Sequence, residues 1–318
     1  MPASSRRSLR PYAALLFAAA SWGVGSTGAK YAVDRLGAIT TLTIGVGTAA
    51  ALLWTVLLVR RPVRVVPLRR YLLLALLEPT VAYGGLDLGL RRTTASDAAL
   101  LDGLQSAMVL VIGLIALKEA ASRRSVTGVL IATFGAALVA GVNVSFSASL
   151  GNALVLLGTL GASASVVLVS VLARDGSALE ITAYQFGFGF LMCLPLLGWQ
   201  WLSNQEQLPA STDLGPILAA VGVGLVCFAI AYVLYNYATG EVPVGVAGMA
   251  LNVIPIFGVL AAVTLLDERL GALQVIGGIL IITGIALFPL QAEGSEPTEP
   301  PTPQYQAAAL PMPEPVAD

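Results

Sequence analysis

The stretch AYGGLD, residues 82–87, recurs as AYVLYN, residues 231–236, at a distance of 149 positions along the chain. At this offset Tyr83 aligns with Tyr232, and Asp87 aligns with Asn236. Polar coincidences at one offset are harder to obtain by chance than matches between apolar helices, so we interpret them as an internal repeat. The same offset aligns Glu119 with Glu268, Gly128 with Gly277, Gly135 with Gly284 and Leu138 with Leu287.

The composition around the repeat is that of a membrane protein. Of the 318 residues, 57% are hydrophobic and 11% are charged, whereas a soluble domain carries about 25% charged residues. Only helices and closed barrels satisfy their backbone groups in lipid, and the apolar runs are too long for barrel strands. The sequence therefore predicts an all-α integral membrane protein with ten transmembrane helices, at about 12–33, 38–59, 71–91, 94–117, 124–142, 150–173, 180–202, 215–239, 243–266 and 271–290.

The repeat then fixes the expected domain organisation. We expect a first five-helix repeat at 12–142, a connecting loop at 143–149 and a second five-helix repeat at 150–290. Because five is an odd number, the second repeat enters the membrane from the opposite side. Such inverted repeats typically enclose a substrate site near the middle of the bilayer.

Orientation follows from the distribution of Lys and Arg, which favours the cytoplasmic side. With the N-terminus inside, 12 of the 17 basic residues lie on the cytoplasmic side. We therefore expect a multi-pass protein of the cell membrane with both termini cytoplasmic, including an N-terminal segment at 1–11 and a disordered, proline-rich tail at 291–318. The basic start and first apolar run also resemble a secretory signal, but the run extends to Val33, beyond the length of a signal core.

The absence of histidine removes imidazole bases and histidine-metal sites from consideration. Cys193 and Cys227 lie inside apolar runs, so we interpret both as packing residues. No cofactor and no metal are expected. The expected partners are a small-molecule substrate and membrane lipid, and we expect no nucleic acid. The protein is expected to be a monomer or a homodimer.

Two acids fall near the middle of predicted spans, where a charge is costly and usually faces a cavity or a partner. Glu78 lies eight residues beyond Arg70 and Asp102 eight residues beyond Thr94, in each case about 12 Å at the rise of a helix. Either could bind a proton or a cation during transport. For Glu78 a structural role is equally compatible with the sequence, namely a bond to a backbone carbonyl freed by Pro79.

The repeated tyrosines suggest the walls of a pocket. Tyr83 and Asp87 are four residues apart and share a helix face, as do Tyr232 and Asn236 in the second repeat. An inverted repeat would bring the two pairs to opposite sides of a central cavity, where aromatic rings and a few polar groups suit a metabolite. Gln105 shares a helix face with Asp102 and joins the candidate cavity residues.

Several motifs recur in order along the chain. They are Ser21-Trp22-Gly23 with Lys30, and Leu100-Leu101 with Glu119, Gly128 and Gly135, echoed by Asn252, Pro255, Glu268, Gly277 and Gly284. In this order they resemble the motifs of the EamA-type transporters of the drug/metabolite transporter superfamily. The resemblance covers about 11–290 and implies ten helices and export or uptake of small metabolites without ATP. It also favours Trp22 and Asn252 as cavity residues. Two departures are Ser106, which stands where a proline is frequent, and the missing Trp-Gly pair in the sixth helix.

The expected function is a secondary transporter, most simply an exporter, for a small metabolite such as an amino acid, an amine or a drug-like compound. It would work by alternating access with proton coupling. The alternative is an intramembrane enzyme acting on a lipid or isoprenoid carrier, with Asp97, Asp102 and Arg91/Arg92 at the outer face. A scaffold or receptor is a third interpretation, for which the chain offers no sizeable soluble domain.

Overall fold

The computed structural model describes residues 9–60, 67–90, 92–93, 98, 101–118, 121–139, 149–206, 214–266 and 271–288. Within these ranges every regular element is helical and there is no strand. The expected N-terminal segment, most of the connecting loop and the expected tail lie outside the described residues, as do Glu119 and Glu268. The all-helical part of the predicted fold class is confirmed.

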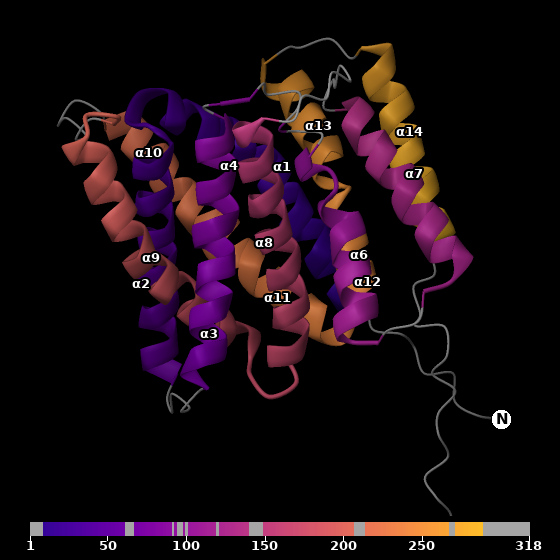
Figure 1. The fold of residues 1–318 in the computed structure, drawn as a ribbon, viewed down its shortest axis with the longest axis horizontal. Coiled ribbons are helices and arrows are strands. Elements are labelled where there is room, and N and C mark those ends of the chain that lie inside the picture. The colour runs from indigo at the N-terminus through magenta and orange to yellow at the C-terminus, as the bar shows by residue number, and fades with distance from the viewer. Residues whose placement is uncertain are drawn as a thin grey trace, which may run out of the picture.

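The first half of the chain supplies α1 to α7 (Figure 1), whose bounds are α1 (Arg10–Leu36), α2 (Ala38–Arg60), α3 (Leu68–Ala75), η1 (Leu76–Val81), α4 (Ala82–Leu90), α6 (Gln105–Ala116) and α7 (Arg123–Val139). The second half supplies α8 (Leu150–Leu172), α9 (Ala178–Leu202), α10 (Leu214–Val223), η2 (Gly224–Ile230), α11 (Ala231–Glu241), α12 (Val244–Leu251), α13 (Ile254–Leu266) and α14 (Ala272–Leu287).

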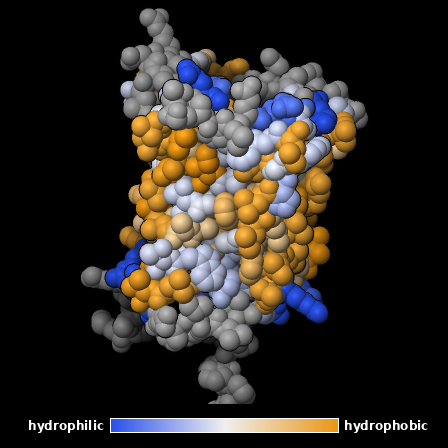
Figure 2. Space-filling model, turned by 90° about the vertical axis from the view of Figure 1, so that its left-hand side faces the viewer, coloured by the Kyte–Doolittle hydropathy of each residue, from blue (hydrophilic) through white to orange (hydrophobic). Residues whose placement is uncertain are grey.

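The described helices make this a multi-pass membrane protein. Five helical stretches are long and apolar enough to cross a bilayer, and they are Ala38–Arg60, Leu150–Leu172, Ala178–Leu202, Leu214–Glu241 and Val244–Ala261. The apolar helices α6 and α14 are shorter. One face of the molecule shows apolar side chains along its height, with strongly hydrophilic residues gathered toward the two ends (Figure 2). This distribution suits a protein whose middle lies in hydrocarbon. The number of ten spans stays a prediction.

Each half contains a π-helical segment at the same place. η1 and η2 continue α3 and α10, and the offset of 149 carries residues 76–81 onto 225–230, inside η2. In η1 the residue before Pro79 is extended rather than helical, with φ −151° and ψ 121° at Glu78. This is expected, because proline disfavours the helical conformation of the residue that precedes it. π-Helical segments are frequent at functional sites.

A second pair of irregularities follows the same offset. Residues 103–104 form a turn before α6, and residues 252–253 form a turn between α12 and α13. Helix breaks at membrane depth are tolerated where they are buried in protein or line a water-filled cavity. The two halves therefore share their interruptions as well as their helices.

Helices α7 and α14 pack directly against each other at one end of the molecule (Figure 1). Gly128 lies against Gly284, and Gly135 lies against Gly277. A Cβ on Gly277 would come within 2.5 Å of the Gly135 carbonyl oxygen, so only glycine permits this approach. Because the residue numbers run in opposite directions, these two helices, which correspond in the repeat, are antiparallel.

At the other end of the molecule, α2 packs against α9 and η2. The α2 N-terminus is capped from a distance by Glu206, whose carboxylate accepts the Ile39 and Thr40 backbone N–H groups at 2.9 and 2.8 Å. Gly37 precedes the helix with φ +88°, and a Cβ there would lie 2.4 Å from Glu206 Cδ. A carboxylate at a helix N-terminus satisfies free N–H groups and complements the helix dipole. This contact fixes the end of α2 that borders the cavity described below.

Candidate functional site

A cavity of about 680 Å³ lies among both halves of the chain. Its walls come from α1, the first turns of α2, η1 and α4, α8, and the η2–α11 segment. It also reaches the turn before α6 and the break between α12 and α13. Six residues predicted to line a cavity or to couple transport are among its lining residues, and they are Trp22, Glu78, Tyr83, Asp102, Gln105 and Tyr232.

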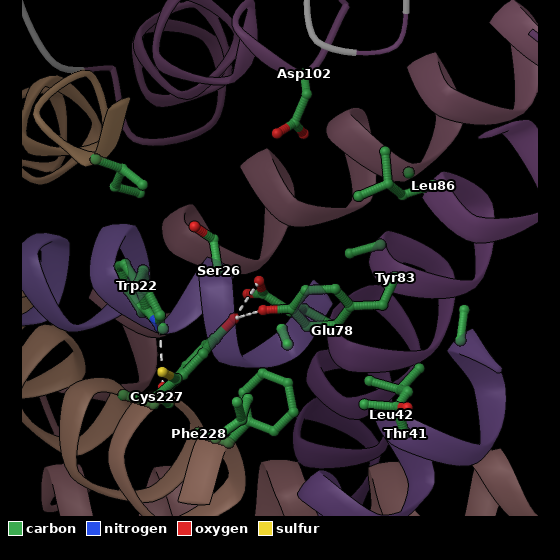
Figure 3. Close-up of a pocket in the computed structure, with 18 of the residues that line it drawn as sticks. Trp22, Ser26, Thr41, Leu42, Glu78, Tyr83, Leu86, Asp102, Cys227 and Phe228 are labelled. Carbon is green, nitrogen blue, oxygen red and sulfur yellow. Dashed lines mark hydrogen bonds between the residues drawn. The ribbon is translucent and has the colours of Figure 1, made fainter. Parts of the chain in front are cut away.

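A hydrogen-bonded cluster forms one boundary of the cavity (Figure 3). The Tyr232 hydroxyl donates to Glu78 Oε1 at 2.6 Å, and it lies 2.8 Å from the Tyr83 hydroxyl. The Ser165 hydroxyl donates to the other carboxylate oxygen at 2.5 Å. We call Glu78, Tyr83, Ser165 and Tyr232 the floor cluster. The offset of 149 that aligned the two tyrosines in the sequence thus corresponds to a direct contact between the halves.

The position of Glu78 follows from the interruption at Pro79. Glu78 is extended, and its backbone carbonyl accepts the Gln185 side-chain amide at 3.2 Å. Its side chain is 9% exposed and binds hydroxyl groups from α8 and α11. The structural role considered for Glu78, a bond to a freed carbonyl, has no counterpart among the contacts of the described residues. Thr80 binds the Ala75 carbonyl instead, at 2.9 Å.

Aromatic rings pack around the floor cluster. Trp22 contacts Tyr232 and Tyr235 edge to face, with centroid distances of 5.1 and 5.2 Å. Tyr83 lies against Phe228 at 5.6 Å. The Trp22 Nε1 group donates to the Cys227 carbonyl in η2 at 2.9 Å, which holds the indole in place. Preorganised aromatic walls with few polar groups are typical of small-molecule sites.

Asp102 lies across the cavity from the floor cluster, just before the turn that precedes α6 (Figure 3). Its carboxylate accepts one long hydrogen bond, from Thr159 Oγ1 at 3.5 Å. Unlike Glu78, Asp102 is exposed, and it lines the cavity. These are the two acids among the described lining residues, and none of those residues is a lysine or an arginine.

Two other predicted residues are buried and do not line the cavity in this structure. Asn236 is buried and donates to Thr182 Oγ1 at 3.0 Å and to Gln185 Oε1 at 3.2 Å, so it belongs to a packed polar layer next to the floor cluster. Asn252 is buried and accepts the Ser106 hydroxyl at 3.2 Å. Neither is among the lining residues. The side chain of Asp87 lies outside the described part of the chain.

Three residues that line the cavity or belong to the floor cluster were not predicted from the sequence as site residues, and they are Ser165, Thr41 and Cys227. Ser165 carries no motif, and Thr41 is one of several threonines in α2. Cys227 was interpreted as a packing residue, and it is buried, but it also lines the cavity and its thiol lies 3.3 Å from the Ser21 carbonyl. The repeat itself contained a signal for Cys227, because the offset of 149 aligns it with Glu78. In the part of the chain that the structure describes, no three cysteines or acids converge as a metal site would require.

Of the residues of the enzymatic alternative, the structure describes Arg92 and Asp102. Arg92 is exposed and donates to the Leu88 carbonyl at 3.0 Å. Asp97 and Arg91 are outside the described residues. Asp102 lines the cavity, whose walls come from both halves of the chain.

Comparisons with known proteins agree with the architecture. Residues 9–141 and 149–289 each match the EamA-like transporter family. The chain is 24% identical over 205 residues to the uncharacterized transporter YetK of Bacillus subtilis, covering 62% of this chain and 60% of YetK. It is 24% identical over 264 residues to an uncharacterized transporter of Archaeoglobus fulgidus, covering 83% of this chain and 93% of the relative. A crystal structure of a protein with 15% identity covers 88% of this chain and 98% of its own, with a TM-score of 0.73, which shows a shared fold.

Proposed function

Because this chain belongs to the EamA-like transporter family, we propose that it is a secondary transporter that exports a small metabolite by alternating access, coupled to protons. The observation that carries the proposal is the cavity, which has walls from both halves and is bounded on one side by hydrogen bonds between them. A carrier needs such a chamber together with a contact between its halves that can break.

The two ends of the cavity differ in a way that supports this mechanism. Its lining includes the second half of α1 and the first turns of α2, so the cavity extends toward the α1–α2 turn. In the other direction, the floor cluster and the layer around Asn236 fill the space between the helices. With cytoplasmic termini, as the Lys and Arg distribution predicts, the α1–α2 turn is extracellular. We infer that the structure represents the outward-facing state.

For the membrane topology we propose ten spans, arranged as oppositely inserted repeats at 12–142 and 150–290. The antiparallel packing of α7 and α14 supports opposite insertion, because these helices correspond in the repeat. The shared π-helical segments and turns support the equivalence of the halves. The substrate-binding residues would then be Trp22, Tyr83, Gln105 and Tyr232, with Glu78 and Asp102 available for coupling.

The proposal is tested by flux into and out of proteoliposomes. Amino acids and amines are assayed with and without a pH gradient, and we expect a gradient to drive at least one of them. Asp102→Asn should abolish the pH-driven component, whereas Asp34→Asn, an exposed acid paired with Lys30 at 2.9 Å, should leave it unchanged. Absence of flux for every compound would overturn the transporter function. Unchanged pH dependence in Asp102→Asn would remove Asp102 from coupling.

A further inference from the structure

We propose that the cargo is an organic amine with an apolar body and without a carboxylate, and that Asp102 is the residue that pairs with its ammonium group. This inference rests on the proposed transport function and specifies the substrate class of the same cavity. It excludes amino acids as good substrates, although they have the size that the cavity accepts.

The described charged residues that line the cavity are acidic, and this favours a cationic cargo. The described lining residues include Glu78 and Asp102 but no lysine or arginine, and the chain has no histidine. Lys30, which follows the lining residue Ala29 on α1, is exposed and paired with Asp34. A carboxylate on the cargo would lose its hydration without gaining a cationic partner, which is strongly unfavourable in an apolar site. An ammonium group would meet charges of opposite sign.

The second argument distinguishes the two acids. Both oxygens of Glu78 already accept hydrogen bonds of 2.5 and 2.6 Å from Ser165 and Tyr232. Asp102 has a single long bond and is exposed to the cavity. Its carboxylate therefore retains the capacity to accept bonds from an ammonium group, whereas Glu78 holds the floor cluster together.

Two of the lining groups that could donate to a cargo carboxylate are already engaged. The Trp22 Nε1 group donates to the Cys227 carbonyl, and the Ser26 hydroxyl donates to the Gly23 carbonyl at 2.7 Å. The lining Gln105 amide and Thr41 hydroxyl are neutral and cannot balance the charge of a carboxylate. The aromatic faces of Trp22, Tyr83 and Phe228 nevertheless provide a surface for an apolar body, and rings also attract cations. The site thus favours a cation joined to an apolar group.

An independent feature indicates that the cavity is built for a polar ligand. Thr41 is 6% exposed and lines the cavity, and its hydroxyl has no hydrogen-bond partner among the described residues. The nearby Thr43 and Thr48 hydroxyls instead bind carbonyls one turn back in α2, at 2.7 and 2.8 Å. A buried hydroxyl without a partner is rare in folded proteins. A polar group on the cargo would satisfy it.

The test uses three compounds that share a phenylethyl body: 2-phenylethylamine, phenylalanine and 3-phenylpropionate. Binding to the purified full chain and flux in proteoliposomes are measured separately at neutral pH. We expect the amine to bind and to be transported, with phenylalanine and phenylpropionate weaker by at least about thirtyfold, as for an unpaired buried charge. Asp102→Asn should weaken amine binding by a similar factor, and the matched Asp34→Asn should not.

The outcomes separate this inference from the transport function. Phenylalanine or phenylpropionate binding as tightly as the amine would overturn the inference, as would unchanged amine binding in Asp102→Asn or the absence of binding by all three compounds. Flux of phenylalanine alone would overturn it while supporting transport. Amine binding without any flux would support the cargo class and contradict the transporter. If Asp102→Asn does not fold, selectivity among the three compounds on the unaltered chain decides the question.

Discussion

Replacing Tyr232 with phenylalanine tests the contact that joins the two halves at the floor cluster. The hydroxyl makes two hydrogen bonds, to Glu78 at 2.6 Å and with Tyr83 at 2.8 Å. Phenylalanine keeps the ring, which packs against Trp22 and Phe186 at 5.1 and 4.9 Å. The substitution therefore removes hydrogen bonds with little change in packing.

The expected loss of stability follows from these two bonds. Hydrogen bonds between membrane helices contribute about 0.6 kcal/mol on average and up to about 1.7 kcal/mol. The short hydrogen bond from Tyr232 to the Glu78 carboxylate should contribute near the upper end of this range, because hydrogen bonds to charged groups are stronger. The hydrogen bond between the Tyr232 and Tyr83 hydroxyls should contribute near the average. Tyr232→Phe should therefore lower the free energy of unfolding by about 2 kcal/mol. The matched control Tyr235→Phe loses one bond of 3.1 Å to the Ala247 carbonyl and should cost about 0.6 kcal/mol.

The assay is unfolding by denaturing detergent in mixed micelles, followed by circular dichroism, with a double-mutant cycle to Glu78→Gln. We expect a coupling energy of about 1 kcal/mol between Tyr232 and Glu78, and a value within the error of additivity, about 0.3 kcal/mol, between Tyr235 and Glu78. Equal losses for the two tyrosines, or no coupling of Tyr232 with Glu78, would refute the assignment of Tyr232 to this contact.

Three further variants test the packing that supports the site, all by the same unfolding assay. Gly277→Ala should lower the free energy of unfolding by more than about 2 kcal/mol, because its Cβ would lie 2.5 Å from a backbone oxygen of α7. The control Gly278→Ala should be neutral or stabilising, because a Cβ there meets no atom within 4 Å. Equal effects of the two substitutions would contradict the close approach. Glu206→Gln should cost about 1–2 kcal/mol through loss of the charged α2 cap, and an unchanged midpoint would contradict it. Thr41→Val should be neutral or stabilising because no hydrogen bond is lost. Thr43→Val should be destabilising because it loses the hydrogen bond to a backbone carbonyl. A larger loss of stability at Thr41 than at Thr43 would show that the Thr41 hydroxyl has a partner.

Much of the fold follows from hydropathy, because lipid forces each apolar run to satisfy its own backbone. The runs at 38–59, 150–173 and 180–202 correspond closely to α2, α8 and α9. The π-helical interruptions of the helices were harder to predict from the sequence. Pro79 signalled the irregularity in η1, but η2 contains no proline and is π-helical all the same. The η2 segment packs against α2 and α1. The local sequence pattern of η2 does not contain this long-range packing, so it could not predict the π-helical geometry.

For the site, the spacing of Tyr83 and Tyr232 was informative because corresponding residues of an inverted repeat meet near its axis. The same reasoning placed Asn236 at the cavity, but Asn236 is not among the lining residues of this structure. Tyr232 and Asn236 lie on one helix, about 6 Å apart along its axis, and Tyr232 and Tyr235 line the cavity whereas Asn236 is buried against Thr182 and Gln185. A helical face can be continuous while the cavity beside it is not. In the proposed cycle, the side on which the cavity is closed would differ between the two states, and one sequence must be compatible with both.

The chemical difference between the halves matters for the proposed cycle. The repeat aligns Glu78 with Cys227, so the two π-helical segments have similar backbones but different side chains. Glu78 accepts hydroxyl bonds from α8 and α11, whereas Cys227 contacts α1 through its thiol and its carbonyl. A rocking motion that exchanges the roles of the halves would break the bond from Tyr232 to the carboxylate, and Cys227 could not form an equivalent one. In the proposed cycle the two states would therefore be held by unequal contacts, and the balance between them would depend on the hydrogen bonds to one carboxylate.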